Sequence, residues 1–177
     1  LWSENLCTSL SLFVELRGGH ADHRAQKRTD RGGGTVYVNG GTYISNGLGS
    51  PAIYSTAEIH AENAELTSNL SEGVCIEGKN SIELTNCNMT ANNTKCNGNA
   101  TFFDTIMIYQ SMSGDADSGT SSFTMNGGTL TSKNGHVFHV TNTNAVINLN
   151  GVKICPAQSS TATVSTYRKG SETAHKS

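Results

Sequence analysis

The chain has few charged residues for a length of 177. Asp, Glu, Lys and Arg together make up 15% of it, and the formal net charge is -2. No arginine occurs between Gly32 and Tyr167. Proteins that bind nucleic acid carry a basic patch for the phosphates, so we predict that nucleic acid is not a partner.

Long hydrophobic runs are also missing. No stretch approaches the roughly 18 apolar residues that a helix needs to span a bilayer, so we predict no membrane insertion. The opening segment LWSENLCTSLSLFVEL is weakly apolar but lacks a basic start and a small-residue cleavage site, which makes it a poor signal peptide. We expect any export signal to lie upstream of it.

Proline and tryptophan are scarce, with two and one residues, whereas glycine occurs 19 times and Asn, Ser and Thr crowd the middle of the chain. This composition favours strands and turns over helices. The five cysteines form no C-x-x-C pair, which argues against zinc and thioredoxin-like sites. We predict that Cys75 and Cys87 are buried thiols and that Cys96 is exposed, and the disulfide state stays open.

A repeat of about 23 residues organises the central part of the chain. Five eight-residue words align without a gap: VYVNGGTY (36–43), IHAENAEL (59–66), IELTNCNM (82–89), FTMNGGTL (123–130) and INLNGVKI (147–154). Their starts differ by 23, 23, 41 and 24 residues, so one insertion lies between the third and fourth words. Short repeats of this period are typical of solenoids.

The columns of this alignment separate an inner face from an outer face. Alternation along a strand places successive side chains on opposite faces. The first, third and eighth columns are apolar and are predicted to point inward. The second column is polar or amphipathic and is predicted to point outward: Tyr37, His60, Glu83, Thr124 and Asn148.

The fifth column contains only glycine and asparagine, the two residue types that enter the left-handed backbone region at low cost. It reads Gly40, Asn63, Asn86, Gly127 and Gly151. The NG pairs within it are also a hairpin signal. A hairpin requires an antiparallel partner after each turn, however, and here a second apolar patch follows before the word returns. We therefore predict five corners rather than five hairpins.

These patterns predict an all-β parallel solenoid of five or six coils, where a coil is one turn of the solenoid. The predicted organisation is an irregular N-terminal segment or cap at 1–31, the solenoid at 32–157 and a Ser/Thr-rich tail at 158–177. The insertion (about 92–105) and the segment 111–120 are expected to project as loops.

Residues 32–154 resemble right-handed parallel β-helices of the pectin-lyase-like superfamily. The segments GSPAIYSTA, EGVCIEGKNSIELTNC, IMIYQSMSGDADSGT and VFHVTNTNAVINL look like those of secreted adhesin-like or carbohydrate-binding β-helix proteins of anaerobic bacteria. The resemblance implies a right-handed solenoid and an extracellular or cell-surface location. It does not choose between lyases, hydrolases, esterases and non-catalytic proteins.

Three kinds of enzyme site that the resemblance suggests find little support in the residues. A calcium-dependent lyase needs a basic residue beside clustered carboxylates, and a methylesterase needs two Asp and an Arg. Residues 32–154 contain no arginine. A hydrolase needs paired carboxylates across the scissile bond. Glu62, Glu65 and Glu83 come nearest to such a pair, and we interpret Glu83 beside His60 as a solvated contact between coils.

A calcium site is a second possibility that the sequence leaves open. Asp115 and Asp117 alternate in the segment SGDADSGT, and together with Asp104 they could turn oxygens toward one hard cation. His136 and His139 are three residues apart, which in a strand places them on opposite faces, so we do not expect this pair to bind a metal.

An aromatic side chain beside polar side chains on an exposed sheet is typical of carbohydrate binding. The candidate residues are Tyr37, Tyr54, His60 and Glu83. Tyr43 shares a column with Leu66 and is expected in the core. The fourth column contains a single threonine, Thr85, so we expect no flat threonine array of the kind found in ice-binding β-helices.

The sequence therefore favours a non-catalytic adhesin-like or polysaccharide-binding module whose partner is an acidic or neutral plant or mucosal glycan. The alternatives are a calcium-dependent polysaccharide lyase-like enzyme and a structural spacer of a surface protein. No cofactor other than calcium is suggested.

Overall fold

The computed structural model describes residues 35–55, 57–94, 103–109, 119–157 and 162–164. These residues form fifteen short strands and no helix. Within this part of the chain no helix is long and apolar enough to cross a membrane. Every strand pairs with strands one coil before or after it, and all pairs are parallel.

Three five-stranded parallel sheets make up the fold, and the chain visits them in the order A, B, C in every coil. Sheet A consists of β1 (Thr35–Asn39), β4 (Glu58–Glu62), β7 (Ser81–Thr85), β10 (Ser122–Asn126) and β13 (Val146–Asn150). Sheet B consists of β2 (Thr42–Ser45), β5 (Glu65–Ser68), β8 (Asn88–Ala91), β11 (Thr129–Ser132) and β14 (Lys153–Cys155). Sheet C consists of β3 (Ile53–Ser55), β6 (Val74–Glu77), β9 (Ile106–Tyr109), β12 (Phe138–Val140) and β15 (Ala162–Val164).

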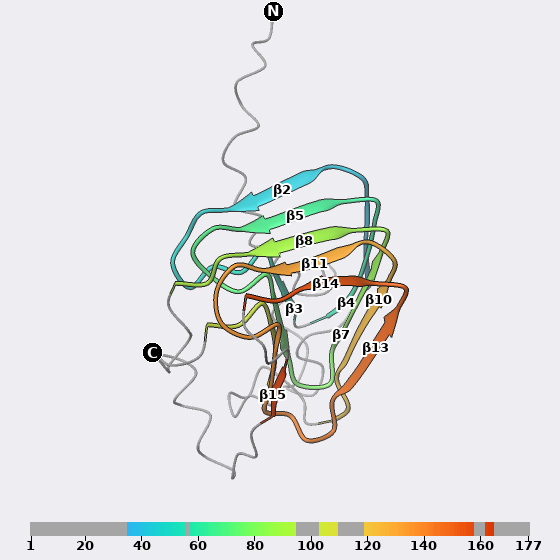
Figure 1. Ribbon diagram of the computed structural model, residues 1–177. Coiled ribbons are helices and arrows are strands. Elements are labelled where there is room, and N and C mark those ends of the chain that lie inside the picture. Colours follow the sequence, from blue (N-terminus) through green and yellow to red (C-terminus); the bar gives the residue numbers. More distant parts are fainter. Residues whose placement is uncertain (1–34, 56, 95–102, 110–118, 158–161, 165–177) are drawn as a thin grey trace, which may run out of the picture.

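The protein is thus a parallel β-solenoid of five coils, as the repeat predicted. Figure 1 shows the strands of sheet B stacked one below another in chain order. The winding is right-handed, in agreement with the rule for parallel strands joined by a crossover, and can be followed in the same view. Sheet C extends to β15, past residue 157 where the sequence predicted the solenoid to end.

The predicted register is confirmed column by column. In sheet A the first column pairs Val36 with Ile59, and Ile59 with Ile82. In sheet B the eighth column pairs Tyr43 with Leu66, and Leu66 with Met89. The later coils continue both columns across the insertion. The longer spacing between the third and fourth words is therefore absorbed outside sheets A and B.

The five corners between sheets A and B have the predicted backbone. Their φ angles are positive and lie between 52° and 71°: Gly40, Asn63, Asn86, Gly127 and Gly151. A second constraint acts at Gly128, where a Cβ would overlap the carbonyl oxygen of Cys87 in the neighbouring coil. Glycine is required at this position because the two backbones approach so closely.

One apolar core runs along the solenoid axis between the three sheets. Side chains of the middle coils, such as Ile82, Leu84 and Phe123, are fully buried. The end coils contribute partly buried residues such as Val36 and Ile147. Tyr43 packs against this core, and Cys75 and Cys87 are buried thiols, as predicted. Cys96 lies outside the described residues. Each buried large side chain contributes about 1.5–3 kcal/mol, so the middle coils carry most of the stability.

The corner at Asn63 offers a direct test of the backbone constraint. We expect Asn63→Val to lower the free energy of unfolding by about 1–2 kcal/mol, because a β-branched residue resists the left-handed conformation. Asn39→Val is the matched control, since Asn39 lies in β1 and is not among the residues with positive φ. Urea unfolding measures the free energy of unfolding of both variants. An equal decrease in the two variants would contradict the role of the corner.

Candidate functional site

The outer face of sheet A brings three of the four predicted sugar-binding residues together. This face consists of the outward side chains of β1, β4, β7, β10 and β13, which form three columns along the solenoid. Tyr37, His60 and Glu83 are consecutive members of the central column. The two flanking columns begin at Thr35 and Asn39. Because the register is exact, each of these side chains has a neighbour directly above or below it.

Tyr37 and His60 stack on one another. Their ring centroids are 5.1 Å apart and their planes differ by 16°. Paired residues of adjacent parallel strands are about 4.8 Å apart, so the two rings face each other without leaving their columns. Tyr37 remains 77% exposed. The face thus presents a large flat ring that one neighbour holds in place.

Both ring nitrogens of His60 lie within hydrogen-bonding distance of a carboxylate. Nδ1 is 3.0 Å from Oε2 of Glu83, and Nε2 is 2.9 Å from Oε1 of Glu58. Only the imidazolium form donates from both nitrogens. The predicted contact between His60 and Glu83 is therefore confirmed, and Glu58 completes a clamp that fixes the imidazole ring under Tyr37.

Hydrogen bonds extend this arrangement across all five strands. The hydroxyl of Thr35 donates to Oε2 of Glu58 over 3.1 Å. The amide of Asn126 donates to Oε1 of Glu83 over 2.9 Å, and the amide of Asn150 donates to Oδ1 of Asn126 over 2.8 Å. Side chains held in such a network lose little conformational entropy when a ligand binds. The face is therefore preorganised despite being exposed.

The hydrogen bond from His60, followed by that from Thr35, lowers the pKa of the Glu58 carboxyl. Glu58 thus stays ionised more readily than an ordinary glutamate. The general acid of a glycoside hydrolase needs the opposite shift, because it must hold a proton near neutral pH. Glu58 is therefore unsuited to donate a proton to a leaving sugar.

Tyr54 lies on sheet C, away from the other three candidates. It pairs in register with Cys75, and its hydroxyl bonds to Glu77 and to the hydroxyl of Tyr109, the latter over 2.9 Å. Burial raises the pKa of both tyrosines above the ordinary value. The Tyr54 ring packs against a small apolar cluster that includes Met107. The structure therefore does not join Tyr54 to the outer face of sheet A.

Asp104, the one calcium candidate within the described residues, forms a buried hydrogen bond with His139. Its Oδ2 is 2.6 Å from Nδ1 of His139, and neither side chain is exposed. Its Oδ1 is 3.9 Å from Nδ1 of His136. The expectation that the two histidines lie on opposite faces is wrong, because His136 precedes β12 and does not follow the alternation of that strand.

The other two calcium candidates, Asp115 and Asp117, lie outside the described residues. Among the residues that are described, no group of three or more His, Cys, Asp and Glu side chains is arranged to hold a metal ion. Asp104 uses one carboxylate oxygen for His139. The calcium hypothesis therefore gains nothing from the geometry around Asp104.

Sheet B carries a threonine column that the sequence analysis missed. Thr67, Thr90 and Thr131 pair in register on its outer side. The aligned words end one residue before this column, so one further residue per word would have revealed it. This column does not form the flat array of an ice-binding β-helix, because Glu65 and Lys153 in the adjacent column break the uniform surface that ice binding requires.

No protein-family model matches the chain, and it matches neither a curated protein nor a solved structure. The topology alone therefore establishes the parallel β-solenoid, and the relation to the pectin-lyase-like superfamily stays a resemblance.

The Glu58–His60 contact predicts a measurable titration. We expect the pKa of Glu58 to lie below its ordinary value and to rise toward that value in His60→Ala. The folded state favours the ionised form of Glu58, so the contact stabilises the protein above about pH 4.3, the pKa of an unfolded glutamate. This stabilisation is lost as the pH falls through the lower pKa of the folded state. Carbon-detected NMR of the Glu58 carboxyl measures both values. An unchanged pKa in His60→Ala would rule out the assigned cause.

The buried and exposed histidine–carboxylate pairs should differ in energy. Asp104→Ala removes the carboxylate that bonds to the buried His139 and is expected to cost about 2–3 kcal/mol of unfolding free energy. Glu83→Ala removes the equivalent partner of His60 on the surface and is expected to cost less than about 1 kcal/mol. Urea unfolding at one pH compares the two variants. Similar losses would show that burial does not govern these contacts.

Proposed function

We propose that this chain is a non-catalytic polysaccharide-binding module and that the outer face of sheet A contacts the glycan. The observation that carries this proposal is the stack of Tyr37 on His60, surrounded by carboxylates, hydroxyls and amides. A sugar ring has an apolar C–H surface, which packs on an aromatic face, and a rim of hydroxyls, which need hydrogen-bonding partners. The outer face of sheet A supplies both.

The repeat of the solenoid suits a long, repetitive ligand. Polar side chains recur along each column at the spacing of the strands, and the amide ladder of Asn126 and Asn150 continues the surface over the last two coils. Several weak contacts to one chain combine into useful affinity through high effective concentration. An extracellular or surface-displayed setting belongs to the same proposal and follows from the resemblance to secreted β-helix proteins.

A binding role suits this face better than lyase chemistry. A lyase of the calcium-dependent type needs a basic side chain to remove a proton next to the sugar carboxylate. The outward positions of sheet A, all of which are described, contain neither lysine nor arginine. Both ring nitrogens of His60 are already engaged by carboxylates, Nδ1 by Glu83 and Nε2 by Glu58, so neither is available to take a proton from a sugar.

Retention on insoluble polysaccharides tests the proposal. We expect Tyr37→Ala to weaken retention about tenfold, which corresponds to the loss of about 1.4 kcal/mol of aromatic contact. Tyr37→Phe should keep most of it. Ile44→Ala removes an exposed apolar side chain of the same coil on sheet B and should have no effect.

Two outcomes would contradict this function. Failure to bind any acidic, neutral or amino-sugar polysaccharide would leave the spacer role. Release of unsaturated product from polygalacturonate in the presence of calcium, followed by absorbance, would establish the lyase.

A further inference from the structure

The outer face of sheet A carries a net negative charge. Its outward positions contain three glutamates, Glu58, Glu62 and Glu83, and a single histidine, His60. With lysine and arginine missing from these described positions, the face carries a net charge of -3 when His60 is neutral and -2 when it is protonated. An anionic ligand would be repelled, since like charges across an interface are costly.

The outer side of sheet B does not share this negative sign. On the outer side of sheet B, Glu65 shares its column with Lys153, so the charges there are mixed. In addition, the Glu65 carboxylate accepts a hydrogen bond from Asn88 over 2.6 Å. The acidic character of sheet A is therefore a local property and does not follow from the net charge of the whole chain, which is only -2.

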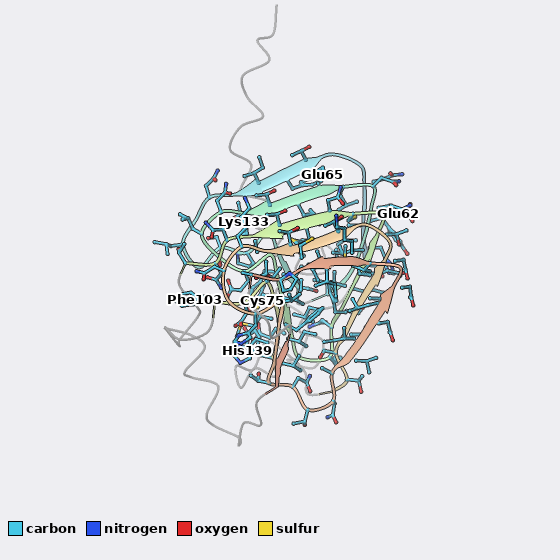
Figure 2. All side chains as sticks on the ribbon, viewed as in Figure 1. Glu62, Glu65, Cys75, Phe103, Lys133 and His139 are labelled. Atoms are coloured by element: carbon cyan, nitrogen blue, oxygen red, sulfur yellow. The ribbon has the colours of Figure 1, made fainter. Side chains whose placement is uncertain are left out.

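The three glutamates differ in how they are used. Both carboxylate oxygens of Glu58 and both of Glu83 are engaged by neighbouring side chains. Glu62 is exposed, and its carboxylate makes no hydrogen bond to the described residues. Figure 2 shows Glu62 at the margin of the fold, and it directly precedes the corner at Asn63 that joins sheets A and B.

An exposed carboxylate beside a sugar-binding surface selects the chemistry of the sugar. An ammonium group donates charge-assisted hydrogen bonds to a carboxylate, whereas a neutral sugar gains only ordinary ones and a uronic acid loses energy by repulsion. We propose that the glycan bound by this face carries free amino groups, that is, amino sugars that are not N-acetylated. This inference rests on the proposed function and narrows the range of neutral and acidic glycans that the sequence had favoured.

A basic peptide also carries ammonium groups, but the glycan accounts for more of the surface. Tyr37 offers a flat, 77% exposed ring held by His60, and such a ring suits the C–H face of a pyranose. The amides of Asn126 and Asn150 and the hydroxyl of Thr124 form ladders with their neighbours and can exchange hydrogen bonds with sugar hydroxyls. A linear polyamine or polylysine would interact with the negative charge of the face but would not contact the aromatic ring or hydrogen-bond to these amides and hydroxyl.

The test compares two polymers that differ only at nitrogen, each immobilised covalently on beads: poly-β-1,4-glucosamine and its fully N-acetylated form. At about pH 5.5 and low ionic strength the free amines are charged while exposed carboxylates remain ionised. We expect retention on the glucosamine polymer to exceed retention on the acetylated one by about tenfold or more through several simultaneous contacts. Added salt should reduce the difference.

Variants separate specific recognition from general charge attraction. Glu62→Gln is expected to reduce retention on the glucosamine polymer about threefold to fivefold and to leave retention on the acetylated polymer unchanged. Glu65→Gln removes the same charge from sheet B and should leave retention on both polymers unchanged. Soluble polylysine should compete poorly compared with soluble glucosamine oligomers.

The outcomes also distinguish this inference from the proposed function. Equal retention on both polymers that is lost in Tyr37→Ala would overturn the preference for free amines and leave polysaccharide binding intact. Equal losses of retention on the glucosamine polymer in Glu62→Gln and Glu65→Gln would overturn the amino-sugar proposal in favour of nonspecific charge attraction. Strong competition by polylysine would overturn it in favour of a basic protein partner. If no polysaccharide retains the protein, both the polysaccharide-binding function and the preference for free amino sugars are contradicted.

Discussion

The corner between sheets A and B is the constraint on which the rest of the structure depends. At five places the chain must enter the left-handed region, and glycine or asparagine occupies each of them. An ordinary residue would resist this conformation, and a corner displaced by one residue would send every following side chain to the opposite face. Because all five corners coincide, apolar columns meet inside and polar columns meet outside.

The binding surface is a consequence of the same register. Tyr37 and His60 stack because they occupy one column in neighbouring coils. The bonds from His60 and Asn126 to Glu83 likewise join strands that the corners have aligned. Forming this surface requires little ordering beyond that of the fold itself, because the main chain already positions each side chain. Its charge then depends on single residues such as Glu62.

Most of the solenoid could be predicted from the sequence because its structure is periodic. A residue's column fixes its direction and its neighbours, which was enough to place the core, the corners and the contact between His60 and Glu83. The clamp by Glu58 was missed because this residue precedes the aligned word. The threonine column of sheet B was missed because it follows the word.

Features outside the repeat could not be found in this way. The contact between Asp104 and His139 joins the end of the insertion to a later coil, and no period relates the two residues. His136 lies just before β12, so strand alternation gave the wrong direction for it. Tyr54 was grouped with Tyr37 by residue type alone, although the two belong to different sheets. Side chains in irregular segments are positioned by contacts that a linear pattern does not contain.

The most direct test of the account is the distance between residues four coils apart, measured by electron–electron double resonance between spin labels. One pair, Asn39 with Asn150, spans sheet A, and another, Thr42 with Lys153, spans sheet B. Stacked coils predict a backbone separation of about 19 Å for both pairs, four strand spacings of about 4.8 Å. Clearly unequal separations, or values far above this, would contradict the stacking of the five corners along one axis.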